Sequence, residues 1–459
     1  MPTLILTQHA NVPGIEHLEV YRAHGGYEAL QAARQMPPED LAEIVDASNL
    51  RGRGGAFFPT GKKWKSIAKD DRPRYVLANA DESEPGTYKD HYLMMRLPHL
   101  LIEGMAIAGH GVHAKQGYVY LRGEALRVQR ILRHAIAEAR AAGILGEEFD
   151  IELHMGAGAY IAGEETGMIE SVEGKRAWPR IRPHFHPSNC GLYCTPTLAN
   201  NVETHCNLPW IVTHGAEAFR QVGSPNAPGT RLICTSGRLR NRDVFELPMG
   251  VTLREVIWGV GGGMAEGHEF KAAIPGGAST PMLPEALLDL PMEPDGYMKQ
   301  ELLLGAGSVT VLGHQDCVIN MALRLNAFFR NESCGKCTPC RDGTDWLVRL
   351  LRRFETGGAV ESDIDLLWDL SDNIIHKTLC ALGWAATVPP QSTIRFFRDE
   401  YLAHIAAGKC PYGNVLAPDA FGWTDDLEHA DHLPRYLEGS PKPELEYRIP
   451  PPGAPSWAL

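Results

Sequence analysis

Residues 117–165, with the sequence GYVYLRGEALRVQRILRHAIAEARAAGILGEEFDIELHMGAGAYIAGEE, decide the fold of the first half of the chain. Residues 117–121 and 150–154 read as strands, and residues 124–142 between them carry apolar side chains at helical spacing. A strand, a crossover helix and a further strand predict parallel pairing within one sheet. The sequence therefore predicts an α/β domain built on a parallel sheet.

Two segments extend this pattern toward the N-terminus. Residues 75–79 form a short apolar run with a polar end, and residues 98–113 read as a helix. Ligands of such sheets bind beyond the carboxyl ends of the strands. The polar segment that starts at Asn79 and the glycine-rich loop that starts at Gly156 both follow predicted strands, so both are candidate binding elements.

The second half of the chain changes character twice. Residues 244–313 hold short strand-like runs and turns that resemble a compact β-grasp unit. After residue 316 apolar side chains recur at helical spacing in four stretches, which predicts a four-helix bundle. Residues 411–459 are rich in proline and acidic residues, and we expect an extended tail there. The predicted division is residues 1–70 (helices and a glycine-rich loop), 71–240, 241–313, 314–410 and 411–459.

Composition excludes several classes of function. The 459 residues are 44% hydrophobic and 22% charged, as in a globular protein, and the net charge of −12 argues against a nucleic-acid surface. No run reaches the roughly 18–20 apolar residues of a membrane span. The N-terminus lacks the basic start and apolar region of a signal peptide. We expect a soluble cytoplasmic protein that meets a membrane only through partner subunits.

Four of the ten cysteines form a metal-binding pattern. Cys334, Cys337 and Cys340 are spaced C-x2-C-x2-C, and Cys380 follows at a distance. Three thiolates at this spacing with a distant fourth are typical of a [4Fe-4S] cluster. Structural zinc sites usually use two C-x2-C pairs, so zinc is the second interpretation and no metal the third. The other six cysteines are expected to be buried small apolar residues, and they are Cys190, Cys194, Cys206, Cys234, Cys317 and Cys410.

Two glycine-rich loops and one acidic segment point to a nucleotide. The loops at residues 52–61 and 156–163 can each present backbone N–H groups to phosphate. The acidic segment NADESEPG, residues 79–86, offers groups for ribose or ribityl hydroxyls and for flavin ring edges. One such loop alone is also what a plain turn looks like. Their combination with an iron–sulfur pattern favours a flavin and nucleotide site.

Taken in order, the motifs resemble a known family. They are GRGGA at 52–56, FPTGKKW at 58–64, NADESEPG at 79–86, GAGAYIAGEET at 156–166, NNVET at 200–204 and ESCGKCTPCR at 332–341. They are similar to the NADH-binding flavoprotein subunit of bacterial respiratory complex I (NADH-quinone oxidoreductase) and to diaphorase subunits of NAD-linked hydrogenases and formate dehydrogenases. The resemblance covers residues 21 to 407 and implies a Rossmann-like FMN domain, a β-grasp (SLBB) domain and a helical bundle carrying the cluster.

The resemblance also implies roles for individual residues. Those that would hold FMN are Asn79, Asp81, Glu82, Ser83, Gly163, Glu164, Asn200, Asn201 and Thr204. Those that would line the flavin and nucleotide loop are Gly52, Gly54, Gly55, Gly61 and Lys63. Those that would hold NADH are Phe58, Glu165, Arg182 and Phe185, with a carboxylate that disfavours the extra phosphate of NADPH.

The chain departs from the family pattern at four positions. Phe57 stands where the family has glycine beside the flavin, so its ring would crowd the nicotinamide. A positive φ there would cost about 1–3 kcal/mol. Arg182 replaces a usual lysine, Ser66 stands where an aromatic residue is common, and Ala162 replaces a cysteine.

The implied activity is NADH dehydrogenase: hydride transfer from NADH to FMN, then single-electron transfer to the [4Fe-4S] cluster and onward toward quinone. No side chain is expected to act as nucleophile or general base. The implied partners are a thioredoxin-like [2Fe-2S] subunit and a multi-cluster iron–sulfur subunit, on the cytoplasmic side of the inner membrane. Two alternatives remain: a diaphorase subunit of a soluble hydrogenase or formate dehydrogenase, and an electron-relay or assembly scaffold with an impaired NADH site, which Phe57 favours.

Overall fold

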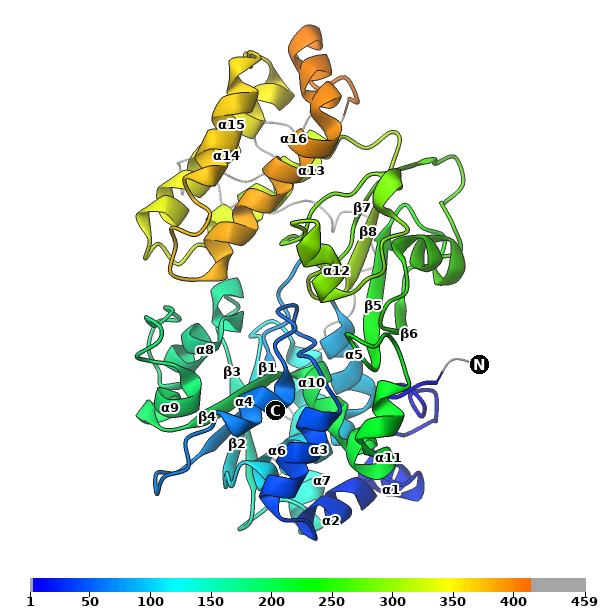
Figure 1. Cartoon of the computed structure of the whole chain (residues 1–459), viewed down its shortest axis with the longest axis vertical. Coiled ribbons are helices and arrows are strands. Elements are labelled where there is room, and N and C mark those ends of the chain that lie inside the picture. Colours follow the sequence, from blue (N-terminus) through cyan, green and yellow to red (C-terminus); the bar gives the residue numbers. More distant parts are fainter. Residues whose placement is uncertain (1–2, 414–459) are drawn as a thin grey trace, which may run out of the picture.

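The computed structural model describes residues 3–413, so almost all of the tail predicted for residues 411–459 lies outside the described residues. Figure 1 shows an elongated body with a parallel sheet and its helices at one end. A second sheet lies beside it, and helices α13 to α16 form the other end.

The parallel sheet has the strand order β3-β2-β1-β4. Its strands are β1 (Tyr75–Ala80), β2 (Gln116–Leu121), β3 (Asp150–Met155) and β4 (Thr197–Asn201), and every pairing is parallel. Helices α6 (Pro98–Gly111) and α7 (Leu126–Ala141) form the predicted crossovers. The parallel sheet is therefore confirmed. β4, which was not predicted, adds to the other side of β1 and creates a point where the strand order reverses.

Short helices surround this sheet. They are α1 (Leu18–Ala23), α2 (Glu28–Arg34), α3 (Pro38–Ala47), α4 (Thr60–Lys65), α5 (Lys89–Arg96), α8 (Glu165–Val172), α9 (Pro187–Cys190), α10 (Val202–Cys206) and α11 (Leu208–Arg220), with 3-10 turns η1 (Tyr160–Gly163) and η2 (Leu192–Cys194). One prediction in this region is wrong. Cys190 and Cys194 are joined by a disulfide across the η2 turn, and Cys194 is exposed. Cys206, Cys234, Cys317 and Cys410 are buried free cysteines, as expected.

The second sheet is mixed and has the order β6-β5-β8-β7. Its strands are β5 (Thr230–Gly237), β6 (Val244–Pro248), β7 (Phe270–Ile274) and β8 (Ser308–Gly313), and only β5 and β8 pair in parallel. The π-turn η3 (Glu255–Val260), the 3-10 turn η4 (Glu285–Leu287) and helix α12 (Pro294–Lys299) complete the unit. Its apolar interior, here called the second-sheet core, contains Ile233, Val309 and Val311. Since β5 belongs to this sheet, the unit starts before the boundary predicted at residue 240.

The C-terminal region is helical, as predicted. It contains α13 (Val318–Glu332), α14 (Thr338–Thr356), α15 (Ser362–Asp372) and α16 (Ala381–Ala407), which share one apolar core. α16 continues through Pro389 and Pro390, although proline disfavours a helix interior. Within residues 3–413, none of the helices is both long and apolar enough to cross a membrane.

Candidate active site

A cavity of about 750 Å³ opens at the carboxyl ends of β1 and β4. The strand order reverses between these two strands, which is where open α/β sheets bind ligands. The loop before β8 contributes Leu303, Gly305 and Ala306 to the wall, and the start of α16 also lines the cavity. The predicted residues that line it are Gly52, Gly54, Gly55, Phe58, Lys63, Asn79, Asp81, Glu82, Ser83, Gly163, Glu164, Glu165, Arg182, Asn200, Asn201 and Thr204.

The loop at residues 52–55 lies against the cavity with its backbone. A Cβ added to Gly54 would lie 3.2 Å from the Cβ of Asn201, and Gly55 has a φ of +106°. Arg53, between Gly52 and Gly54, is only 1% exposed and points the other way. Its Nη2 donates to the Pro228 carbonyl at 2.7 Å, and its backbone N–H donates to Thr204 Oγ1 at 2.9 Å. Arg53 therefore anchors the loop so that only glycine backbone faces the cavity.

Three buried polar atoms at the cavity have no internal partner within the described residues, namely Thr87 Oγ1 and one atom each of Asp81 and Asn200. Asp81 Oδ1 and Asn200 Nδ2 find no hydrogen-bond partner within residues 3–413, although both side chains are less than a tenth exposed. Burial raises the pKa of Asp81 to about 7, and nearby Arg122 only partly offsets this effect. An unpaired buried acceptor and an unpaired buried donor each cost about 1–3 kcal/mol. A bound ligand that offers a hydroxyl and a carbonyl would satisfy both atoms.

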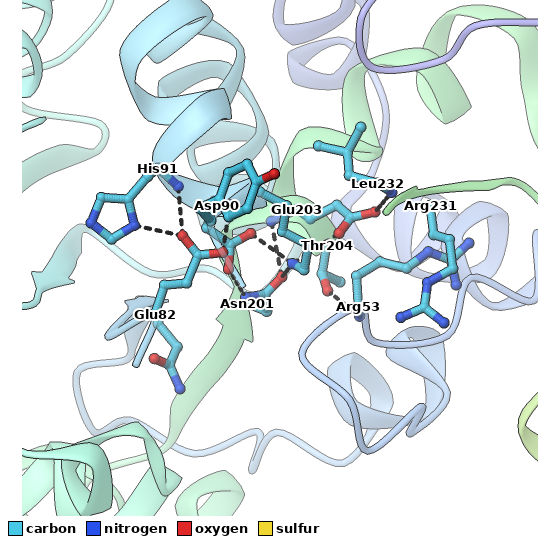
Figure 2. A network of polar contacts seen from close by, with 12 residues as sticks. Arg53, Glu82, Asp90, His91, Asn201, Glu203, Thr204, Arg231 and Leu232 are labelled. Carbon is cyan, nitrogen blue, oxygen red and sulfur yellow. Dashed lines mark hydrogen bonds and ion pairs between the residues drawn. The ribbon is translucent and has the colours of Figure 1, made fainter. Parts of the chain in front are cut away.

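A buried charge network lies beside the cavity (Figure 2). Lys89, 1% exposed, forms ion pairs of 2.8 Å with both Asp90 and Glu203. Asn201 Nδ2 donates to Asp90 Oδ2 at 2.6 Å. Glu203 also accepts the backbone N–H of Leu232 in β5 at 2.8 Å, so the network ties the parallel sheet to the second sheet. Burial raises the pKa of Asp90 to about 6, against the attraction of Lys89, while the surrounding carboxylates raise the pKa of Lys89 despite its burial.

Glu82 belongs to the same network and does not reach a ligand freely. Its carboxylate accepts the backbone N–H groups of Asp90 and His91 at 2.8 Å each, and a ring nitrogen of His91 lies 2.5 Å away (Figure 2). It therefore fixes the start of α5. The predicted FMN residues thus fall into two groups: Asp81 and Asn200 have unpaired atoms at the cavity, whereas Glu82, Asn201 and Thr204 hold the surrounding loops in place.

Charged side chains line another part of the cavity. Lys63 Nζ pairs with the Glu165 carboxylate and donates to the Ala199 carbonyl at 2.8 Å. Arg182 Nη2 lies 2.8 Å from Glu164 and 3.6 Å from Glu165. Burial opposes ionisation of Glu165, but Lys63 and Arg182 outweigh it and hold the pKa of Glu165 below its usual value. Glu164 also caps α8 through the backbone N–H groups of residues 166 and 167.

Two predicted residues lie apart from the cavity lining. A Cβ on Gly61 would lie 2.2 Å from the Cα of Asp46, so this glycine permits α4 to pack on α3. Phe185 is 44% exposed on the loop between α8 and α9. Phe57 has the suspected positive φ, +52°, but its ring is only 5% exposed and packs into the second-sheet core. Phe57 packs into that core and also lines the cavity.

The four predicted cluster cysteines gather where α13, α14 and α16 meet. Cys334 and Cys337 lie between α13 and α14, Cys340 lies in the first turn of α14, and Cys380 directly precedes α16. The backbone N–H of Leu379 donates to Cys337 Sγ at 3.3 Å, which joins the two segments. Cys380 also lines the cavity. A cluster on these thiolates would border the cavity directly.

Several lining residues were not predicted. Tyr160 Oη donates to Glu84 at 2.7 Å, and Glu84 accepts the backbone N–H of Ser279 at 2.7 Å, which links the glycine loop to the second sheet. Tyr160 and Glu84 lie inside motifs that the sequence had already singled out, so their positions were the available signal. Ser279 and residues 303–306 lie on loops without a recognisable pattern.

Comparison with known proteins accounts for this combination. The family model described as the Nuo51 FMN-binding domain matches residues 45–210, and the model of the NADH-ubiquinone oxidoreductase-F iron–sulfur binding region matches residues 320–404. The NADH-quinone oxidoreductase F subunit of Mycobacterium tuberculosis strain H37Rv is 46% identical over 425 residues, which span 89% of this chain and 95% of the relative. The corresponding F subunit of Escherichia coli K12 is 45% identical over 409 residues, 87% of this chain and 91% of its own. The chain belongs to the family of NADH-quinone oxidoreductase F subunits.

The fold is shared with a second kind of enzyme. The solved structure of an NAD+-reducing [NiFe]-hydrogenase in the H2-reduced state superposes with a TM-score of 0.78 at 31% identity, over 88% of this chain and 67% of that chain. The FMN-binding model covers the glycine loop, β1 and β4, and the iron–sulfur model covers all four predicted cluster cysteines. Membership in this family therefore agrees with the cavity and with the cysteine site beside it.

Proposed function

We propose that the chain is the NADH-oxidising flavoprotein subunit of a bacterial NADH-quinone oxidoreductase, with FMN, NADH and one [4Fe-4S] cluster as its cofactors. One observation carries the proposal: a cavity with unpaired buried polar atoms at its base is bordered by Cys380 of a four-cysteine site. When bound, FMN accepts a hydride from NADH and delivers the two electrons singly, as an iron–sulfur cluster requires.

The chain itself would bind and orient the cofactors. Asp81 and Asn200 would pair with polar edges of FMN through the atoms that lack partners. The glycine backbone of residues 52–55 would approach the flavin closely, because no side chain intervenes. Asn79, Ser83, Gly163 and Glu164 are the further residues proposed to contact FMN, while Glu82, Asn201 and Thr204 would hold it through the loops that they fix. Cys334, Cys337, Cys340 and Cys380 would carry the cluster beside the cavity.

Glu165 and Arg182 would select and hold NADH. The low pKa of Glu165 keeps its carboxylate charged, so it would accept ribose hydroxyls and repel the additional phosphate of NADPH. Phe58, 53% exposed at the rim, offers a face for stacking, and Phe185 is proposed for the same role. Lys63 compensates the charge of Glu165.

The same proposal extends to the architecture and the assembly. We assign residues 230–313 to an SLBB-type β-grasp domain and helices α13 to α16 to a four-helix bundle around the cluster. The partners would be a thioredoxin-like [2Fe-2S] subunit and a multi-cluster iron–sulfur subunit, at the cytoplasmic face of the inner membrane. The hydrogenase likeness supports a diaphorase role as the second candidate. Affinity purification of the tagged chain distinguishes the two roles. Co-purifying membrane subunits would support the NADH-quinone oxidoreductase, and a co-purifying soluble hydrogenase or formate dehydrogenase would support the diaphorase.

An anaerobic titration tests the activity. The chain is loaded with iron, sulfide and FMN, and NADH is added while the visible spectrum and low-temperature EPR are recorded. We expect bleaching of the flavin together with the signal of a reduced [4Fe-4S] cluster. Cys380→Ala is the matched control, in which the flavin should still bleach without the cluster signal. A wild-type flavin that stays oxidised with NADH but is reduced by dithionite would favour the scaffold alternative.

A further inference from the structure

A second group of potential metal ligands lies at the opposite end of the helical region. Cys317, Glu355, His404 and Cys410 bring their ligand atoms within 4.8 Å of one another. Each side chain is at most 3% exposed. Glu355 follows Cys340 by fifteen positions along α14, which is about 22 Å, so this group is distinct from the four cluster cysteines.

The group joins three helices that lie side by side in Figure 1. Cys317 is the N-cap residue of α13, Glu355 lies in the last turn of α14, and His404 lies in the last turn of α16. Cys410 follows α16, and its backbone N–H donates to the Glu355 carbonyl at 3.0 Å. Four ligands from four separate segments leave no spacing pattern in the sequence.

The distances fit tetrahedral coordination. Cys317 Sγ lies 3.3 Å from Glu355 Oε1 and 3.3 Å from His404 Nε2, and these last two atoms are 3.2 Å apart. Zinc bonds of about 2.0–2.3 Å at tetrahedral angles place such donor atoms about 3.4–3.6 Å apart. A shift of a few tenths of an ångström would therefore admit the ion.

Neighbouring groups orient the ligands as in known zinc sites. His404 Nδ1 lies 2.7 Å from the Glu400 carbonyl, to which it can only donate, so the lone pair of Nε2 faces the other three ligands. Asn320 Nδ2 donates to Glu355 Oε2 at 2.8 Å and leaves Oε1 directed at the group. The backbone N–H of Asn320 donates to Cys317 Sγ at 3.3 Å.

Without a cation these contacts are poorly satisfied. With Nδ1 as the donor, neutral His404 presents an acceptor to the Glu355 acceptor 3.2 Å away. The Cys317 thiol has one proton and faces both atoms. Without the ion, the single Cys317 proton cannot satisfy Glu355 Oε1 and His404 Nε2 at once. A central dication satisfies all four groups together.

We propose that Cys317, Glu355, His404 and Cys410 bind one structural zinc ion. Two sulfur ligands, one imidazole and one carboxylate suit Zn²⁺, and four protein ligands leave no open position for catalysis. Binding releases the two thiol protons as the thiolates form. The ion ties the start of α13, the ends of α14 and α16 and residue 410 into one unit.

Metal analysis of the full chain, loaded with FMN and its iron–sulfur cluster, tests the proposal. We expect about one zinc and four irons per chain. Cys410→Ala should lose the zinc and keep the iron and the flavin. Cys206→Ala, another buried free cysteine, is the matched control and should keep both metals. Full iron and flavin with no zinc, after growth in zinc-supplemented medium, would overturn the proposal.

X-ray absorption at the zinc edge identifies the ligand atoms in the wild-type protein, so it tests the assignment even if Cys410→Ala fails to fold. The wild-type protein should show two sulfur ligands at about 2.3 Å and two nitrogen or oxygen ligands at about 2.0 Å. A shell of four sulfurs would place the zinc on the four cluster cysteines. A shell without sulfur would indicate zinc bound at the surface. Either of these two results contradicts the assignment.

Discussion

Replacing Phe57 with glycine tests how the residue at the flavin loop balances backbone strain against packing. Phe57 holds a φ of +52°, in the left-handed region that a phenylalanine rarely adopts. Its ring is 5% exposed in the second-sheet core, and the Arg231 guanidinium lies 5.3 Å from the ring centroid. Glycine would relieve the backbone and remove the ring at the same time, so the two effects oppose each other.

The loss of packing should outweigh the relief of backbone strain. Relief of the left-handed conformation returns about 1–2 kcal/mol. Deletion of a buried phenylalanine costs about 3–5 kcal/mol, and the extra freedom of glycine in the unfolded chain costs roughly 0.5–1 kcal/mol more. The lost contact with Arg231 adds to this side. Phe57→Gly should therefore destabilise the second sheet by about 3 kcal/mol.

Amide hydrogen exchange measures the stability of the second sheet locally. Amides of β5 and β8 should exchange roughly 100-fold faster in Phe57→Gly if they open through the same unit. Phe57→Leu is the matched control: it keeps the left-handed backbone and most of the apolar volume, so it should cost about half as much or less. Slower exchange in Phe57→Gly than in the wild type would refute the reasoning, because strain would then outweigh packing.

Three further predictions concern charged groups. Lys89→Met leaves two buried carboxylates without their cation and should lower the free energy of unfolding by about 3–5 kcal/mol in urea denaturation. The exposed Lys65→Met is the control and should change the free energy of unfolding little. Burial raises the pKa of Asp81 to about 7, so the folded state binds this proton more tightly than the unfolded chain. The free energy of unfolding of the flavin-free wild type should therefore fall relative to that of Asp81→Asn as the pH rises from 4 to 7. The fall should be at most roughly 4 kcal/mol and should stop above pH 7. A difference between the two proteins that does not change with pH would contradict the shifted pKa. Glu165→Gln should raise activity with NADPH relative to NADH in steady-state assays, and an unchanged ratio would remove Glu165 from the proposed selection.

The parallel sheet was predictable because its strands and crossover helices repeat a strong local pattern. β4 was missed because TLANN is short and ends in two asparagines, which on their own favour a turn. Only its pairing with β1 makes it a strand. β5 likewise pairs with a distant strand, β8, which begins about seventy residues further along the chain.

The candidate site was predictable to the extent that its residues lie in motifs. Asn79, Asp81 and Asn200 line the cavity as expected. The division of labour among these residues depends on partners from other segments, and a motif does not contain them. Phe57 illustrates this: its positive φ was anticipated from the family glycine, but the direction of its ring is set by a core that forms from residues at least 170 positions away.

The buried network around Lys89 explains how separate motifs form one cavity. Buried ion pairs contribute little net stability, because the cost of removing charges from water offsets their attraction. Here, however, the network fixes positions. Glu82 holds the acidic segment to α5, Glu203 holds α10 to β5, and Thr204 holds Arg53 and the glycine loop. An apolar replacement of equal volume could preserve the packing, but it would not orient three loops toward one point. The charges beside the cavity are therefore better explained by the alignment of the flavin-binding loops than by stability.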